Sequence, residues 1–364
     1  MSRPGKMIAA FLGLLLFIFV AAVLVSRSTD RGKTRGQEML TESEAALRYP
    51  YQTLNTREKA LYTALYRGML SCRTEIALPE SYSDAEYRRI YLLVTMQEPE
   101  LFYLSDVYEL RGEIDSVRIH YDMSPEQIGG QRGRLEAAAD RILSRISPVQ
   151  SDWQKLLMIH DAVAAGCMYE ESGSSDNALG CLADGLAVCE GYAKAFLYTA
   201  RRAGLNAMCV SGTSARGELH VWNIAEIGGK YYNIDVTWDD QTDELTAVHS
   251  CFAVPDRNFT DHSADLTAFQ PPECTEMLES YYWKRGLVLS EKAQLTARLT
   301  EWGAQYAAEG LLEFQCSSDA LFQEVKAVLQ ADPMMQITLS QAVGGRGMRL
   351  MYDDRRQVVI VVTR

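Results

Sequence analysis

Two adjacent glycines, Gly228 and Gly229, constrain the fold of this chain more than any other feature. They lie within the segment ELHVWNIAEIGGKYYNIDVTWDD, where apolar and polar residues alternate on both sides of the pair. Adjacent glycines supply the two positive φ angles of a tight two-residue turn. We therefore predict an antiparallel hairpin with strands over residues 219–227 and 230–237.

The turn also predicts which residues face each other across the hairpin. With the residues beside the glycines paired, Trp222 lies opposite Asp235, and His220 lies opposite Thr237. His220 and Asp235 then become diagonal neighbours on one face, about 7 to 8 Å apart at the backbone. The carboxylate can hold one imidazole nitrogen and leave the other to accept a proton. Trp222 could shield this pair from water, whereas Trp238 is expected to point to the other face and fill the core.

Cys189 stands at the predicted start of a helix over residues 189–203, because the residues that follow place apolar side chains on one helical face. Unpaired N–H groups and the positive end of the helix dipole stabilise a thiolate at this position. The same N–H groups can donate to a nearby oxyanion. The alternative is a buried cysteine that packs against the sheet. Tyr169 is a candidate second oxyanion donor, and a half-buried aromatic is its simpler interpretation.

Three motifs, CEGYA, HVWN and NIDVTWDD, occur in this order and together resemble the core of the transglutaminase-like superfamily over about residues 150–285. QEPELFYLS, at residues 97–105, resembles the accessory region of bacterial exported or membrane-tethered proteins of this kind. The resemblance implies an α+β, papain-like arrangement with a cysteine on a helix and a histidine and an aspartate on a sheet. It makes Cys189 the nucleophile, His220 the general base and acid, and Asp235 the orienting residue.

The chain is predicted to have five parts. They are an N-terminal transmembrane anchor (1–25), a linker (26–45), a mostly helical accessory region (46–145), the catalytic core (146–285) and a small α/β module (286–364).

Capping-box spacings predict two helix starts in the accessory region, at Asn55 with Glu58 and at Ser83 with Glu86. A strand is expected over residues 117–121. Further predicted elements are helices over 125–145, 151–165, 290–308 and 319–330, and strands over 207–211, 311–314, 335–341, 347–352 and 357–362.

Residues Met7 to Val25 form an uncharged apolar run flanked by basic residues. At 1.5 Å per residue this run spans a hydrocarbon core of about 30 Å. We predict a retained single-pass anchor with the catalytic domain outside the cytoplasm, and a cleaved secretory signal is the alternative. The formal net charge is −12, and residues 41–364 alone carry −16 because the first forty residues hold six basic and two acidic side chains. Nucleic acid is therefore not an expected partner.

The eight cysteines contain no CxxC pair, and His160, His249 and His262 lack neighbouring ligands at zinc-site spacing. We predict no metal and no cofactor, and we expect these histidines to be structural or surface residues. Most cysteines are expected to be buried free thiols.

The predicted function is acyl transfer or hydrolysis at a peptide or protein amide through a Cys189 thioester. Cell-wall peptide is one candidate substrate. Two alternatives remain at this point: a catalytically silent domain that binds peptides, and a scaffold whose C-terminal module binds a partner.

Overall fold

The computed structural model of the chain describes residues 39–111, 114–170, 175–240, 247–306 and 310–363. The predicted membrane anchor over residues 1–25 lies outside these ranges. No helix within the described ranges is long and apolar enough to cross a membrane.

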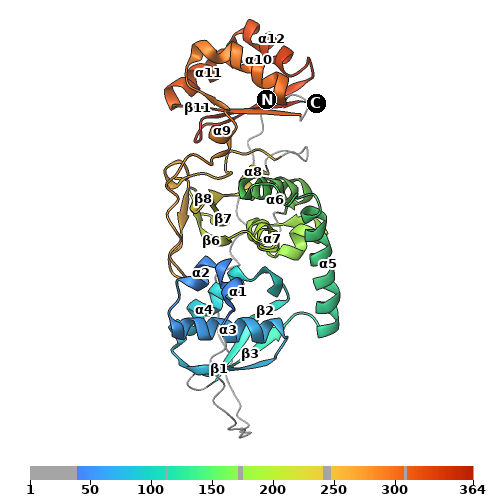
Figure 1. Cartoon of the computed structure of the whole chain (residues 1–364), viewed down its shortest axis with the longest axis vertical. Helices are drawn as coiled ribbons and strands as arrows, with labels where there is room; N and C mark the ends of the chain where they lie inside the picture. The colour runs from blue at the N-terminus through green and yellow to red at the C-terminus, as the bar shows by residue number, and fades with distance from the viewer. Residues whose placement is uncertain (1–38, 112–113, 171–174, 241–246, 307–309, 364) are drawn as a thin grey trace.

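The described chain is arranged as three tiers along its long axis (Figure 1). We call residues 39–121 the N-terminal tier, residues 152–264 the middle tier and residues 281–363 the C-terminal tier. Helix α5 (Pro125–Leu143) runs along the side of the first two tiers.

The N-terminal tier is an α+β unit. Its elements are α1 (Glu42–Ala46), α2 (Tyr49–Gln52), α3 (Thr56–Leu70), β1 (Glu75–Tyr82), α4 (Asp84–Gln97), the 3-10 turn η1 (Pro99–Leu101), β2 (Leu104–Arg111) and β3 (Ile114–Tyr121). The strands form an antiparallel sheet in the order β1-β3-β2. Both predicted capping boxes, at Asn55 and Ser83, are confirmed. Helices are the main elements of the predicted accessory region, as expected, but β1 and β2 were not predicted, and α1 begins inside the predicted linker.

The middle tier holds one four-stranded antiparallel sheet in the order β8-β7-β6-β9. Its elements are α6 (Asp152–Gly166), β4 (Met168–Tyr169), the π-helical turn η2 (Gly180–Asp184), β5 (Leu186–Ala187), α7 (Cys189–Arg202), β6 (Ala207–Ser214), β7 (Leu219–Ile227), β8 (Lys230–Ile234), α8 (Val236–Asp239), η3 (Asp256–Asn258) and β9 (His262–Ala264). The hairpin turn is confirmed, because Ile227 pairs with Lys230 and both glycines have positive φ.

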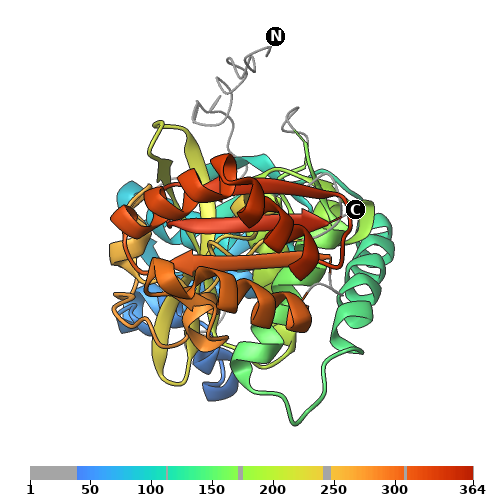
Figure 2. The same cartoon turned by 90° about the horizontal axis from the view of Figure 1, so that it is seen from above.

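The C-terminal tier is a sheet in the order β10-β11-β13-β12, with α10, α11 and α12 on its outer face (Figure 2). Its elements are α9 (Tyr281–Lys284), β10 (Val288–Leu289), η4 (Lys292–Gln294), α10 (Leu295–Tyr306), β11 (Leu311–Cys316), α11 (Asp319–Ala331), α12 (Pro333–Ala342), β12 (Met348–Asp353) and β13 (Val358–Thr363). The predicted strand over residues 335–341 is wrong, because this segment is part of α12. Asp332 caps that helix by accepting hydrogen bonds from two N–H groups, and Pro333 occupies its first turn.

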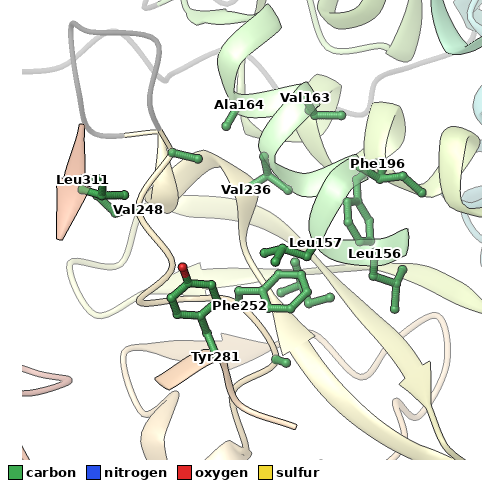
Figure 3. Close-up of a cluster of buried hydrophobic side chains, with 14 of the residues drawn as sticks. Leu156, Leu157, Val163, Ala164, Phe196, Val236, Val248, Phe252, Tyr281 and Leu311 are labelled. Atoms are coloured by element: carbon green, nitrogen blue, oxygen red, sulfur yellow. The ribbon is translucent and has the colours of Figure 1, made fainter. Parts of the chain in front are cut away.

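Apolar side chains cover both faces of the middle sheet. On one face α6 and α7 enclose a core that includes Leu157, Phe196 and Phe252 and continues into the C-terminal tier (Figure 3). On the other face Met208 and Trp222 pack with the apolar residues of the N-terminal tier. The middle sheet is therefore the shared wall of two cores.

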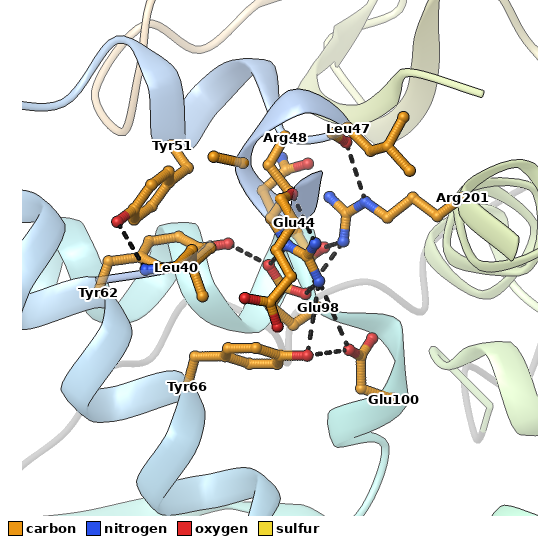
Figure 4. Close-up of polar contacts among 12 residues, drawn as sticks. Leu40, Glu44, Leu47, Arg48, Tyr51, Tyr62, Tyr66, Glu98, Glu100 and Arg201 are labelled. Carbon is orange, nitrogen blue, oxygen red and sulfur yellow. Dashed lines mark hydrogen bonds and ion pairs between the residues drawn. The ribbon is translucent and has the colours of Figure 1, made fainter. Parts of the chain in front are cut away.

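A buried carboxylate, Glu98, joins the N-terminal tier to α7 (Figure 4). Its oxygens accept hydrogen bonds from Arg48 Nε at 2.8 Å and Arg201 Nη1 at 3.0 Å, and the Tyr62 hydroxyl also donates to it. Burial opposes ionisation, but the two guanidinium groups hold the pKa of Glu98 below its usual value. Arg201 lies in the last turn of α7, so this network fixes the end of the helix that begins at Cys189.

Candidate active site

Cys189 is the first residue of α7, as the sequence predicted. The preceding residue, Val188, provides no side-chain cap for the helix, so no side chain competes for the first N–H groups. Gly191, in the first turn, lets the chain at residues 175–177 pass close to the helix. A Cβ at this position would lie 2.6 Å from Ala187 Cβ and 3.1 Å from the Asn177 carbonyl oxygen. The Cys-Glu-Gly sequence thus exposes a helix start while keeping its surroundings tightly packed.

Asp235 reaches the site by a different route from the one predicted. Strand β8 ends at Ile234, so the expected pairs Trp222–Asp235 and His220–Thr237 do not form. Asp235 is instead the N-cap of α8, and its Oδ1 accepts hydrogen bonds from the N–H groups of Thr237 at 3.0 Å and Trp238 at 3.2 Å. The cap turns the chain out of the strand and leaves Oδ2 directed into the site.

Asp235 and His220 lie together, and Cys189 is a second hydrogen-bond partner of the imidazole. His220 Nε2 lies 2.7 Å from Asp235 Oδ2 in a buried contact. Burial disfavours the charged imidazole, but Asp235 and a hydrogen bond with Cys189 raise the pKa of His220 to about 10. Burial opposes ionisation of Asp235 as well, and His220 and His262 hold its pKa below the usual range. Since Nε2 faces Asp235, Nδ1 is the ring nitrogen available to Cys189.

His262 is a site residue that the sequence analysis assigned to a structural or surface role. Its Nε2 lies 2.9 Å from Asp235 Oδ2, so one carboxylate oxygen bridges two histidines. His262 comes from β9, which pairs with β6 at the edge of the sheet. Gly212 makes this pairing possible, because a Cβ there would lie 2.1 Å from the Ser263 carbonyl oxygen. The glycine in the strand was the only local signal of a close backbone approach.

Aromatic rings enclose the histidines. The Trp222 ring is stacked at 6.3 Å from His220, consistent with the expected shielding role. The prediction for Trp238 is wrong, because its ring lies 5.5 Å from His220 and 4.3 Å from His262. Trp238 follows the Asp235 cap on α8, so the end of β8 redirects it toward the site. Phe259 stacks on His262 with ring centroids 3.8 Å apart.

Tyr169, the candidate second oxyanion donor, lies on the short strand β4 and is 46% exposed. β4 pairs in parallel with β5, which leads into the helix start at Cys189. The ring of Tyr169 lies 6.5 Å from that of Tyr192 in α7. Its role as a donor stays a prediction.

A second group of histidines and carboxylates lies between α6 and the C-terminal tier. Asp161 Oδ1 is 2.9 Å from His160 Nδ1 and 2.9 Å from His249 Nε2. The remaining ring nitrogens are held by buried carboxylates, with His160 Nε2 3.1 Å from Asp239 Oδ2 and His249 Nδ1 against Glu313. The members of this group are far apart along the chain, so local sequence patterns did not predict it.

Two imidazole nitrogens and a carboxylate oxygen are donor types that zinc takes, and those of His160, Asp161 and His249 lie within 4.8 Å of one another. No metal ligands were predicted from the sequence, but among the described residues both this group and the group of His220, Asp235 and His262 have donor atoms placed closely enough to hold a divalent cation. Held as they are by hydrogen bonds, His160, Asp161 and His249 also form a complete ionic network without one.

The eight cysteines all lie in the described ranges, and none forms a disulfide. Cys72 and Cys189 are partly exposed, and the other six are buried. Burial raises the pKa of the Cys209 and Cys316 thiols to about 12 in each case. Cys189 therefore differs from most of the others in both its exposure and its histidine partner.

Residues 137–236 match the transglutaminase-like superfamily. The chain thus carries a transglutaminase-like domain, which confirms the resemblance drawn from the motifs, and the predicted α+β class of its core is confirmed as well. No protein of curated function matches the chain in sequence.

Three solved structures show partial similarity. A candidate cysteine protease from Cytophaga hutchinsonii is 17% identical, with a TM-score of 0.27, over 39% of this chain and 47% of that one. A TGase is 13% identical, with a TM-score of 0.28, over 45% and 50% of the two chains. A candidate protease from Parabacteroides distasonis ATCC 8503 is 10% identical, with a TM-score of 0.29, over 69% and 51%. This chain spans about half the length of each of these proteins.

Proposed function

We propose that this chain is a cysteine-dependent enzyme that cleaves or transfers the acyl group of a peptide or protein amide. One observation carries the proposal: a buried His220–Asp235 pair, 2.7 Å apart, meets Cys189 at an uncapped helix start. This is the relation of nucleophile, base and orienting group that covalent acyl transfer requires.

The proposed chemistry starts from a protonated His220, whose pKa of about 10 keeps it charged at neutral pH. The positive imidazole and the helix start stabilise a Cys189 thiolate. The sulfur attacks the amide carbonyl carbon, and the first N–H groups of α7 donate to the resulting oxyanion. His220 then gives a proton to the leaving amine as the C–N bond breaks and a thioester forms. A water or an amine, deprotonated by His220, attacks the thioester and releases Cys189.

Exposed apolar side chains beside the site support a peptide substrate. Leu186, three residues before the nucleophile, is 39% exposed, and Leu219, beside His220, is 50% exposed. Met168 pairs with Leu186 across the β4–β5 ladder and is 63% exposed. Large apolar side chains grouped on the surface of a soluble protein commonly mark a binding face. We propose that they contact apolar side chains next to the reacting amide.

We further propose that the enzyme is tethered to the cell membrane by residues 7–25, with its catalytic domain outside the cytoplasm. The support is the uncharged apolar run flanked by basic residues. Fractionation of cells that express the chain, followed by protease treatment of intact spheroplasts, tests this. Recovery of the intact chain in the soluble fraction would contradict it.

The activity is tested by labelling the full chain with limiting iodoacetamide at pH 6 and mapping the modified peptides. Cys72 is the matched control, because it is the other partly exposed cysteine. We expect Cys189 to react at least about 100-fold faster than Cys72, and His220→Gln to abolish the difference. Equal rates for the two cysteines would refute the enzyme and favour a peptide-binding domain. A peptide library with and without a primary amine then separates hydrolysis from acyl transfer to an amine.

A further inference from the structure

One arginine of the C-terminal tier is buried against the middle tier. Arg356 lies in the turn between β12 and β13, and its side chain is only 4% exposed. Its Nη2 donates to Asp261 Oδ1 at 2.9 Å, and its Nη1 lies 3.4 Å from Asp353 Oδ2. A guanidinium placed this deep needs a specific reason, because desolvation of a charge is costly.

Asp261 connects Arg356 to the candidate active site. The oxygen that binds Arg356 also accepts a hydrogen bond from His262 Nδ1 at 2.8 Å. Burial opposes ionisation of Asp261, but His262 and Arg356 lower its pKa to about 2, so it is a carboxylate at neutral pH. Asp261 is therefore a charged bridge between the C-terminal tier and His262.

His262 completes the connection. Its Nδ1 faces Asp261 and its Nε2 faces Asp235, so the two ring nitrogens join two carboxylates. Asp235 Oδ2 in turn holds His220 Nε2. An unbroken series of contacts, each 2.7 to 2.9 Å long, thus runs from Arg356 to the imidazole beside Cys189.

Arg356 also supports the aromatic rings that line the site. Its guanidinium carbon lies 5.6 Å from the centroid of the Trp238 ring and 5.4 Å from that of Phe259. These rings contact the two histidines, and Phe259 is stacked on His262. The same side chain therefore contacts both α8, which Asp235 caps, and the segment that leads into β9.

We propose that Arg356, Asp261 and His262 are positioning residues through which the C-terminal tier sets the orientation of Asp235 and His220. The proposal rests on the proposed function, and it makes the C-terminal tier a working part of the catalytic site. Arg356 does not touch the reacting atoms. It acts through Asp261 and His262 on a carboxylate whose other contacts are the α8 cap and His220 itself.

Two neighbouring arginines provide a matched test. Arg355 Nη1 lies 3.3 Å from the other Asp261 oxygen, but its side chain is 55% exposed. We would label Cys189 with iodoacetamide at pH 6 in full-length wild type, Arg356→Met, Arg356→Lys and Arg355→Met. Small displacements of a catalytic group cost about 100-fold in rate. We expect about 10- to 100-fold slower labelling for Arg356→Met, partial recovery for Arg356→Lys, and a change under about twofold for Arg355→Met, because exposed ion pairs are weak.

His262→Gln gives a second measurement if Arg356→Met fails to fold. The glutamine amide can donate to only one of the two carboxylates, and we expect labelling about 10-fold slower. Melting curves identify variants that are folded.

Fast labelling of wild-type Cys189 together with wild-type rates in folded Arg356→Met and His262→Gln would overturn this proposal and leave the enzyme intact. A rate in Arg356→Lys no higher than in Arg356→Met, with both folded, would also overturn it, because recovery by a second cation is required. If wild-type Cys189 labels no faster than Cys72, both proposals fall.

Discussion

The two histidine groups of the middle tier are built alike, and only one of them contains a nucleophile. In each, a single aspartate oxygen lies 2.7 to 2.9 Å from two imidazole nitrogens, Asp235 in one group and Asp161 in the other. Each group also contacts the C-terminal tier, through Arg356 or through Glu313. A carboxylate bridging two histidines is thus not a catalytic site by itself.

The difference lies in the second nitrogen of each imidazole. His160, His249 and His262 have both ring nitrogens against carboxylates. His220 has one nitrogen on Asp235 and faces Cys189 with the other. Proton transfer needs a nitrogen that is not already held by a carboxylate. Within these two groups, His220 alone meets that condition.

The largest expected effect is a difference in the rate of Cys189 labelling between two variants, each of which lacks one histidine of one group. His220→Gln should slow Cys189 labelling at pH 6 by about 100-fold or more, the usual contribution of a general base or acid. His249→Gln should change that rate by less than about threefold in protein that remains folded, because His249 does not face the nucleophile. Rate constants from quenched labelling check both. An equal loss of labelling rate in the two variants would show that both groups influence the reactivity of Cys189.

Removing a carboxylate from the second group, that of His160, Asp161 and His249, should lower the free energy of unfolding. Glu313→Ala leaves His249 without its buried partner and removes the acceptor of the Tyr282 hydroxyl, which lies 2.8 Å from Glu313 Oε2. Breaking a buried ionic contact costs about 3 to 5 kcal/mol. Urea unfolding measures this, with Glu324→Ala as the control because Glu324 pairs with Lys292 at the exposed surface of the same tier. A loss for Glu313→Ala as small as that of the control would argue against a structural network.

The pH dependence of stability offers a finer test. Burial disfavours a charged His249, but Glu313 and Asp161 raise its pKa to about 10. Since the pKa is raised on folding, the stabilisation is fully present below the unfolded value of about 6.5 and is lost as the pH rises through about 10. The slope is about 1.4 kcal/mol per pH unit for one proton. The free energy of unfolding of the wild type, measured with urea between pH 7 and 9.5 in EDTA, should therefore fall more steeply with rising pH than that of His249→Gln. Parallel curves would contradict the assigned charge.

The smallest effect is expected for an ion pair that is exposed to solvent. Arg134 Nη2 lies 2.6 Å from Asp184 Oδ1, but both side chains are about half exposed. A double-mutant cycle to alanine should give a coupling of about 0.2 to 1 kcal/mol. A coupling comparable to the loss in Glu313→Ala would mean that burial does not explain the strength of the second group.

Local sequence signals predicted the parts of the site that depend on local geometry. The glycine pair predicted the hairpin that carries His220, and the apolar periodicity after Cys189 predicted the helix that begins there. The proximity of His220 to Asp235 was predicted correctly but for the wrong reason. Strand β8 was predicted to extend to residue 237, whereas the carboxylate of Asp235 caps α8 and the strand pairing ends at Ile234.

The missed features depend on contacts between distant segments. His262 reaches Asp235 only because β9 joins the edge of a sheet whose centre is β6 and β7. His249 meets Asp161 across 88 residues of chain.

Strand β1 was missed because Pro79 interrupts its sequence and its burial pattern alternates only in part. The tail segment at 335–341 is compatible with either period, and the Asp332 cap decides for the helix.

The Arg201–Glu98 contact has a consequence for dissecting this protein into fragments. The region that matches the family begins and ends inside a larger packed unit. A fragment that starts after α5 would leave Arg201 without Glu98 and would expose Met208 and Trp222 on the second face of the sheet. Limited proteolysis should therefore release no smaller stable fragment around Cys189. We therefore expect the three tiers to unfold as one unit.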